Sequence, residues 1–147
     1  MKFGNQNVYR VVLDTNVFVS GGTISVGPPS QIINHWRNQD FVMVVSPQLL
    51  TEYEEVLSRP SVMKFTGLTP KENAQYIQEV ADRAYITSGR LTLDVLINDP
   101  DDNMVLACAE EGAATHLVTG NGKDFPFTDY KGIQILTPRE FLTILEQ

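Results

Sequence analysis

The sequence predicts an α/β fold, in which a mostly parallel central sheet of four to five strands is flanked by helices in three layers. Four short apolar segments are mostly continuous rather than alternating, as expected for strands of a parallel sheet that is covered on both faces. Segments with helix start signals fall between these strands. The chain has 147 residues, 42% of them apolar, and no linker or repeat, so we expect a single domain over residues 1–147.

The expected elements mostly alternate between strands and helices along the chain. The strands are predicted at residues 9–13, 41–45, 116–119 and 133–136, with a weaker one at residues 85–87. Thr69 and Glu72 have the spacing of a capping box, as do Thr137 and Glu140, and each pair predicts the start of a helix. Further helices are predicted around Trp36, over residues 47–58 and over residues 103–109.

The composition argues against several classes of function. There are 18 acidic and 11 basic residues, and the net charge of −7 repels a phosphate backbone, so non-specific binding of nucleic acid is not the expected main task. A metal-filled acidic site escapes this objection, because bound cations reverse the local charge. Cys108 is the only cysteine, which excludes an intramolecular disulfide and argues against a structural zinc site.

The expected location is the cytoplasm, with no membrane partner. The longest apolar run, residues 104–109, is far too short to span a membrane, and the first seven residues lack the apolar core of a signal peptide. A lone cysteine also agrees with a reducing compartment.

Three carboxylates stand at the ends of apolar elements. Asp14 follows the first strand, Asp102 opens the helix over residues 103–109, and Asp124 comes shortly after the strand at residues 116–119. A carboxylate against an apolar element costs free energy unless it is paired or binds a cation. Asp14 and the loop over residues 119–124 lie at strand carboxyl ends, where α/β sheets bind their ligands. Converging acids predict a site for hard divalent cations, and hence an enzyme that acts on phosphate esters.

These acids also have structural explanations. Asp14 could cap the short helix that follows it, although the two polar residues after it offer caps as well. One helix N-terminus could be stabilised by all three of Asp99, Asp101 and Asp102. However, one acid as the cap and one to interact with the helix dipole are enough, which leaves one acid without a structural role. In the helix over residues 47–58, helical phase places Glu52 and Glu54 on the two flanks of the apolar stripe and does not choose between them.

Four segments, in this order and with this spacing, resemble the PIN-domain ribonucleases, especially the single-domain bacterial and archaeal members that act as toxins in toxin–antitoxin pairs. They are residues 12–16, 46–57, 99–109 and 117–125. The resemblance covers about residues 8–141. It implies a PIN-like fold and a hydrolase that cleaves the phosphodiester bonds of single-stranded RNA.

The resemblance also implies a set of site residues and so selects Glu52 over Glu54. The catalytic acids would be Asp14, Glu52, Asp102 and Asp124. One or two Mg²⁺ or Mn²⁺ ions would be held by Asp14, Asp102 and Asp124. The carboxylates and waters around the metal would be oriented by Thr15, Asn16, Thr119 and Asn121.

The chain departs from one common form of the family pattern, in which an acid directly follows Thr-Gly. Asn121 stands at that position and Asp124 comes three residues later, so the fourth ligand and the second ion stay open. The substrate implied is single-stranded RNA. Its phosphates could meet Arg59 and Lys64, and Phe18 or Phe125 could stack on a base. An antitoxin protein and a second copy of the chain are further partners that the resemblance allows.

Two rival interpretations remain. An aspartate-nucleophile phosphatase also places an Asp after its first strand but generally needs a second Asp two residues later, where this chain has Asn16. A catalytically inactive PIN-like module that binds RNA or a protein is suggested by Asn121.

Overall fold

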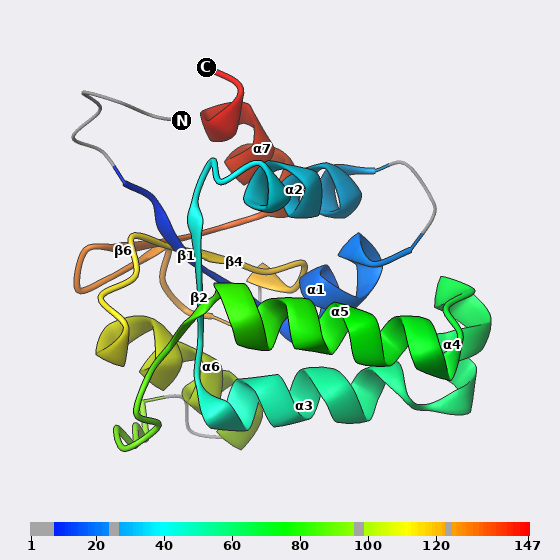
Figure 1. Cartoon of the computed structure of the whole chain (residues 1–147). Helices are drawn as coiled ribbons and strands as arrows, with labels where there is room; N and C mark the ends of the chain where they lie inside the picture. Colours follow the sequence, from blue (N-terminus) through cyan, green and yellow to red (C-terminus); the bar gives the residue numbers. More distant parts are fainter. Residues whose placement is uncertain (1–7, 24–26, 96–98, 123–124) are drawn as a thin grey trace.

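The computed structural model describes residues 8–23, 27–95, 99–122 and 125–147. Within these residues, six strands form one sheet in the order β3-β2-β1-β4-β6-β5 (Figure 1). The strands are β1 (Arg10–Leu13), β2 (Val42–Val45), β3 (Tyr85–Ile86), β4 (His116–Val118), β5 (Asp129–Tyr130) and β6 (Ile133–Leu136). All neighbouring strands are parallel except β5 and β6, which are antiparallel. The predicted α/β fold with a mostly parallel sheet is confirmed.

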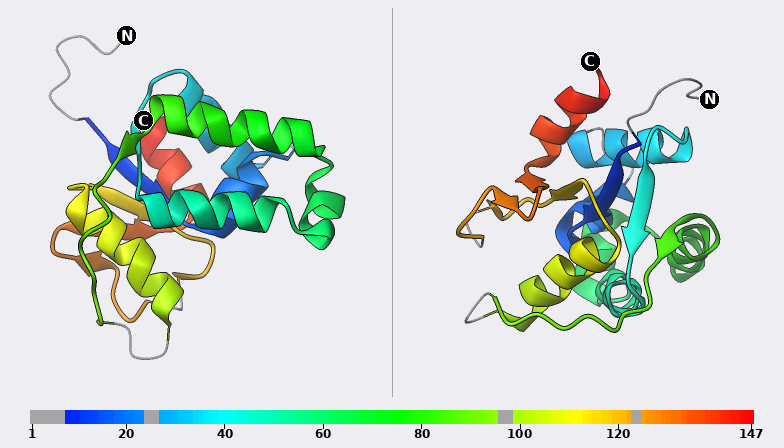
Figure 2. Two further views of the ribbon diagram at one scale, coloured as in Figure 1. Left: turned by 60° about the horizontal axis from the view of Figure 1, so that its bottom comes forward. Right: turned by 90° about the vertical axis from the view of Figure 1, so that its left-hand side faces the viewer.

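Helices cover both faces of this sheet. They are α1 (Thr15–Gly21), α2 (Pro28–Arg37), α3 (Pro47–Leu57), α4 (Pro60–Thr66), α5 (Pro70–Arg83), α6 (Pro100–Glu111) and α7 (Pro138–Leu145). Helices α2 and α7 pack together on one side of the sheet, and α6 packs against β1, β2 and β4 on the other (Figure 2). The result is a three-layer α/β/α arrangement.

Local sequence explains where most helices begin. Proline occupies the first turn of every helix from α2 to α7, where its missing N–H costs no hydrogen bond. The capping boxes predicted at Thr69 and Glu72 and at Thr137 and Glu140 are both formed, at the starts of α5 and α7.

The core lies between the sheet and its helices. Val11, Val12 and Leu13 of β1 are fully buried, as are Leu117 and Val118 of β4. This burial explains why both strands read as continuous apolar runs. Because Leu13 pairs with Val118, the residues that follow β1 and β4 lie side by side at the carboxyl edge of the sheet.

Two elements of the fold were not predicted. Strand β5 is only two residues long, and α4 follows directly on the end of α3, whereas the sequence predicted a single helix over residues 47–58 in this region. The weak strand predicted at residues 85–87 is present as β3, at the edge of the sheet. None of the helices within the described residues is long and apolar enough to cross a membrane.

Candidate functional site

Asp14 is held at the carboxyl edge of the sheet by hydrogen bonds from two elements. Its Oδ1 accepts from the backbone N–H of Thr15 at 2.8 Å and so caps α1. Its Oδ2 accepts from the hydroxyl of Thr119, just after β4, at 2.7 Å. Thr119 is fully buried, and its hydroxyl also accepts from the backbone N–H of Asn121 at 3.0 Å. Asp14 is therefore a helix cap, as its structural explanation proposed, and it is also fixed in orientation by a buried residue that follows the neighbouring strand.

Glu52 reaches the same edge from α3. The Thr15 hydroxyl donates to Glu52 Oε2, so Thr15 links the carboxylate of α3 to the residue that follows Asp14. Partial burial raises the pKa of Glu52 above its usual value, and the hydrogen bond from Thr15 opposes this rise. The negative charges of Asp101 and Asp14 raise the pKa further. Three elements thus bring these carboxylates close enough to interact electrostatically.

The first turn of α6 contributes further acids. Asp99 is the N-cap, and its Oδ1 accepts from the backbone N–H of Asp102 at 3.1 Å. A hydrogen bond with the side chain of Asp102 is the main cause that lowers the pKa of Asp99. Asp102 is only 8% exposed, whereas Asp101 is exposed to solvent.

Topology places this turn at the same edge as Asp14. Helix α6 leads into β4, which is parallel to β1, so the helix runs back across the sheet from the carboxyl edge to the amino edge. Arg10 at the amino end of β1 confirms this direction, because its guanidinium donates to the carbonyl of Gly112, just after α6, at 2.7 and 3.0 Å. The N-terminus of α6 consequently lies beyond the carboxyl ends of the strands.

The loop after β4 contributes Thr119 directly and approaches Asn16. A Cβ atom at Gly120 would lie 3.3 Å from Asn16 Nδ2, so a glycine lets this loop pass close to α1. Asn16 and Asn121 are both exposed. Asp124, the predicted fourth acid and third metal ligand, lies outside the described residues.

The donor set fits a hard divalent cation, although no complete site is assembled in the described part of the chain. Among residues 8–23, 27–95, 99–122 and 125–147, no three His, Cys, Asp or Glu side chains are grouped closely enough to hold a metal ion together. The groups at the edge are nevertheless all oxygen donors, which Mg²⁺ and Mn²⁺ prefer. Burial is the main cause that raises the pKa of Glu52, and repulsion by Asp101 and Asp14 adds to it; a bound cation would relieve that repulsion.

Two aromatic residues suggested for base stacking are buried. Phe18 is fully buried between Tyr53 and Tyr76, with ring centroids 3.9 and 4.2 Å away, and Phe125 is 5% exposed. The suggestion that either of them stacks on an RNA base is therefore wrong.

Tyr53 and Tyr76 are residues of the site region that the sequence did not single out. The Tyr53 hydroxyl donates to the carbonyl of Leu13, the residue before Asp14, and the Tyr76 hydroxyl donates to the carbonyl of Phe18 in α1 at 2.7 Å. They hold the backbone on both sides of the Asp14 turn. A tyrosine on an apolar helix face resembles an ordinary core residue, so no local signal distinguished them.

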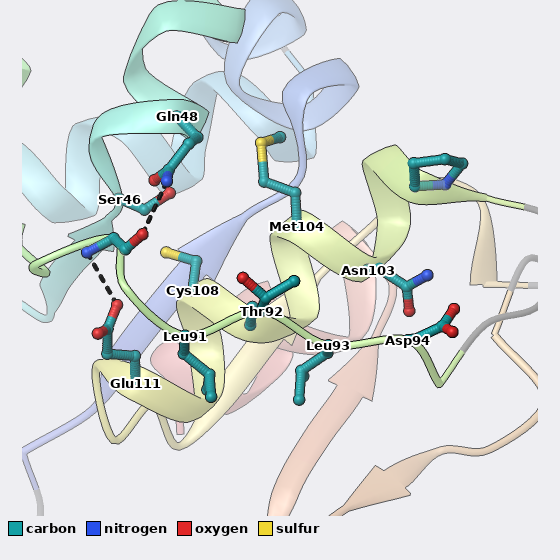
Figure 3. A pocket seen from close by; sticks show the side chains of 13 residues that line it. Ser46, Gln48, Leu91, Thr92, Leu93, Asp94, Asn103, Met104, Cys108 and Glu111 are labelled. Carbon is teal, nitrogen blue, oxygen red and sulfur yellow. Dashed lines mark hydrogen bonds between the residues drawn. The ribbon is translucent and has the colours of Figure 1, made fainter.

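A pocket of about 550 Å³ is lined by other residues than the acids of the candidate site (Figure 3). Its lining includes Gln48 from the first turn of α3, Met104 and Cys108 from α6, and Thr92 from the extended segment that crosses α6. Neither Asp14, Glu52 nor Asp102 lines it. Burial raises the pKa of the Cys108 thiol to about 12, so this cysteine is not a reactive thiolate at neutral pH.

Comparison with known proteins identifies the family. No curated protein matches the chain. The family model described as a PIN domain matches residues 10–123, a range that contains β1, the acids of α3 and α6, and the loop after β4 as far as residue 123. The chain therefore belongs to the PIN-domain family.

Proposed function

We propose that the chain is a divalent-metal-dependent endoribonuclease that hydrolyses the phosphodiester bonds of single-stranded RNA. PIN domains are generally nucleases, which gives the class of reaction. The observation that carries the proposal is the linkage at the carboxyl edge, where Thr119 holds Asp14 and Thr15 holds Glu52. Structural capping alone would require neither the hydroxyl of Thr119 nor the carboxylate of Glu52.

The proposed metal ligands are Asp14 and Asp102, with Asp124 as the third. When bound, Mg²⁺ or Mn²⁺, as one ion or two, supplies positive charge for the phosphate and lowers the pKa of a bound water. Thr119 and Thr15 fix the orientation of two of the carboxylates, so little reorganisation is needed at the moment of reaction. Glu52, whose pKa is raised, is suited to accept a proton from the attacking water at the oxygen that Thr15 does not occupy.

The test is cleavage of a generic single-stranded RNA in the presence of Mn²⁺ or Mg²⁺. EDTA should abolish cleavage, and Asp14→Asn should reduce it by roughly a hundredfold or more, as the loss of a metal ligand would. Glu54→Gln is the matched control, since Glu54 is an exposed carboxylate two residues from Glu52 and should be dispensable. Full activity in EDTA or in the Asp14→Asn protein would overturn the mechanism.

A catalytically inactive PIN module that binds RNA or a protein is the second candidate. It is favoured by Asn121, which stands where one common form of the family pattern has an acid. Binding of RNA without any cleavage in Mn²⁺ would establish it.

We further propose a toxin role, which extends the nuclease proposal. The support is the resemblance of the ordered motifs to toxin members of the family. Expression of the parent chain in bacteria should arrest growth, and expression of Asp14→Asn should not. Growth arrest relieved by the product of a neighbouring gene would identify an antitoxin partner, whereas unimpaired growth with active parent protein would exclude the toxin role.

A further inference from the structure

A locally basic segment connects α3 to α5 in this acidic chain. Residues 56–71 contain three basic residues, Arg59, Lys64 and Lys71, and no acidic residue, although acids outnumber bases in the whole chain by 18 to 11. In Figure 1, α4 lies at one end of the pair formed by α3 and α5. We call residues 59–71 the basic tip. Such a local reversal of charge is where a polyanion would be attracted.

Phe65 is an exposed aromatic residue in the middle of this tip. Its exposed fraction is 68%, the highest among the exposed large hydrophobic residues of the described chain, and it directly follows Lys64. A single exposed apolar residue needs no explanation by itself. An exposed ring beside an unpaired cation does suit a single strand of RNA, because the ring can stack on a base while the cation contacts a neighbouring phosphate.

The basic tip is a fixed scaffold, so the exposure of Phe65 is built into the fold. Gly67 adopts φ +75° to end α4, and the buried Thr66 accepts from the backbone N–H of Leu68 at 3.2 Å. The buried Asn73 of α5 donates from Nδ2 to the carbonyl of Leu57, at the end of α3, at 3.0 Å. The capping box of Thr69 fixes the start of α5.

The cations of the basic tip are available to a ligand. Within the described residues, Lys64 and Lys71 form no ion pair. Arg59 pairs with Glu55 at 3.1 Å, but the two side chains are 55% and 67% exposed, and a pair this exposed contributes at most about 1 kcal/mol. A phosphate could readily take the place of Glu55 on Arg59.

We propose that the basic tip holds single-stranded RNA next to the acids of the candidate site, with Phe65 stacking on a base and Lys64 and Lys71 contacting phosphates. This inference rests on the proposed nuclease function. Helix α3 leads from the acids toward the basic tip: Glu52 lies five residues, about 8 Å along the helix axis, before the end of α3 at Leu57, and the tip begins two residues later at Arg59. The acids repel the phosphates of the RNA. The cations of the basic tip, just beyond the end of α3, would therefore hold the RNA strand within reach of the acids. Stacking on Phe65 would accept any base, since every base has a π face.

The test measures binding separately from cleavage. A fluorescently labelled, unstructured RNA is titrated with the protein in EDTA, and its anisotropy gives the Kd. Phe65→Ala should weaken binding by roughly 5- to 150-fold, the equivalent of the ~1–3 kcal/mol contributed by one stacked base, and Phe65→Trp should retain it. Lys64→Gln should reduce the slope of log K against log salt concentration by about 0.7, the value for one phosphate contact on a single strand.

Tyr85→Ala is the matched control, because Tyr85 is an aromatic residue that is 48% exposed on the edge strand β3, outside the basic tip. Its Kd should equal that of the parent. The proposal is overturned if the parent does not bind the RNA, or if Phe65→Ala binds it as tightly as the parent. It is also overturned if Phe65→Ala instead changes the oligomeric state in analytical ultracentrifugation, which would make the tip an interface between copies, or if only an acidic protein and no RNA binds there.

Failure of the nuclease proposal would look different. If RNA binding depends on the basic tip but no metal-dependent cleavage occurs, the nuclease proposal is disproved and the RNA-binding proposal stands. If Phe65→Ala cleaves RNA with an unchanged kcat/KM, the nuclease proposal stands and the RNA-binding proposal is disproved.

Discussion

Glu52 and Glu54 are two residues apart on α3, yet their surroundings differ. Glu52 is half-buried, accepts from Thr15 and experiences the charges of Asp14 and Asp101, whereas Glu54 is exposed. The difference arises from residues more than 35 positions away in the sequence, because Thr15 lies 37 residues before Glu52. Because of this difference, Glu52 should affect the pH dependence of protein stability, whereas Glu54 should not.

We predict that Glu52→Gln stabilises the protein at neutral pH in the absence of divalent metal. The folded state raises the pKa of Glu52, so it binds this proton more tightly than the unfolded state does. The free energy of unfolding therefore falls as pH rises from the usual pKa through the raised one, and the cost is present above the raised pKa. Urea unfolding from pH 4 to 7 should show that the advantage of Glu52→Gln over the parent grows with pH. Glu54→Gln is the control, and an advantage independent of pH would contradict the prediction.

Asp101 and Asp102 provide a second comparison at the scale of single residues. Asp102 is buried at the start of α6, whereas Asp101 is exposed. We predict that Asp102→Asn reduces cleavage as much as Asp14→Asn does, whereas Asp101→Asn retains most of the activity. Rates of RNA cleavage with saturating Mn²⁺ test this. If Asp101→Asn is the more damaging change, the assigned register of α6 is wrong by one residue.

At the scale of elements, the turn from β1 into α1 is held from several sides. Phe18 of α1 stacks between Tyr53 of α3 and Tyr76 of α5, with nearly parallel rings at interplanar angles of 6° and 4°. The hydroxyls of the two tyrosines reach the carbonyls of Leu13 and Phe18. This cluster ties together the helices that carry Asp14 and Glu52.

We predict that Phe18→Ala lowers the free energy of unfolding by about 3–5 kcal/mol, since it removes a fully buried aromatic side chain. Phe65→Ala should change it by no more than about 0.5 kcal/mol, because Phe65 is mostly exposed. Urea denaturation of both variants provides the measurement. A large loss of stability in Phe65→Ala would mean that Phe65 packs against the fold, and would also weaken its assignment as a stacking surface.

At the scale of the whole molecule, the proposed metal site implies that the acids at the carboxyl edge lower stability when no cation is bound. Two carboxylates about 4 Å apart repel by roughly 4 kcal/mol at an effective dielectric of about 20. A cation that binds only the folded state adds RT ln(1 + [L]/Kd), about 2.7 kcal/mol at a hundredfold excess over Kd.

We predict that Mn²⁺ or Mg²⁺ raises the Tm of the parent and raises that of Asp14→Asn much less. Without metal, Asp14→Asn should melt at or above the parent, because Asn still caps α1 while one negative charge is removed. Thermal melts of both proteins with and without metal test this. A metal-free Asp14→Asn protein that melts well below the parent would mean that Asp14 serves the fold alone.

The sequence by itself determined the local elements and the chemical character of the edge. The capping boxes at Thr69 and Thr137 act within one helical turn, and the apolar runs of β1 and β4 follow from burial on both faces, so both could be predicted from neighbouring residues. The positions of Asp14 and Asp102 at the ends of apolar elements were likewise visible in the sequence.

Only the tertiary structure decided the strand order, the two-residue β5 and the partners of the acids. The hydroxyl of Thr119 reaches Asp14 across 105 positions, and that of Thr15 reaches Glu52 across 37, distances at which no sequence periodicity carries information. The same reason explains why the sequence did not reveal which phenylalanines are buried. Phe18, Phe65 and Phe125 are chemically identical in the sequence, and only packing by distant helices and strands buries two of them and leaves Phe65 in solvent.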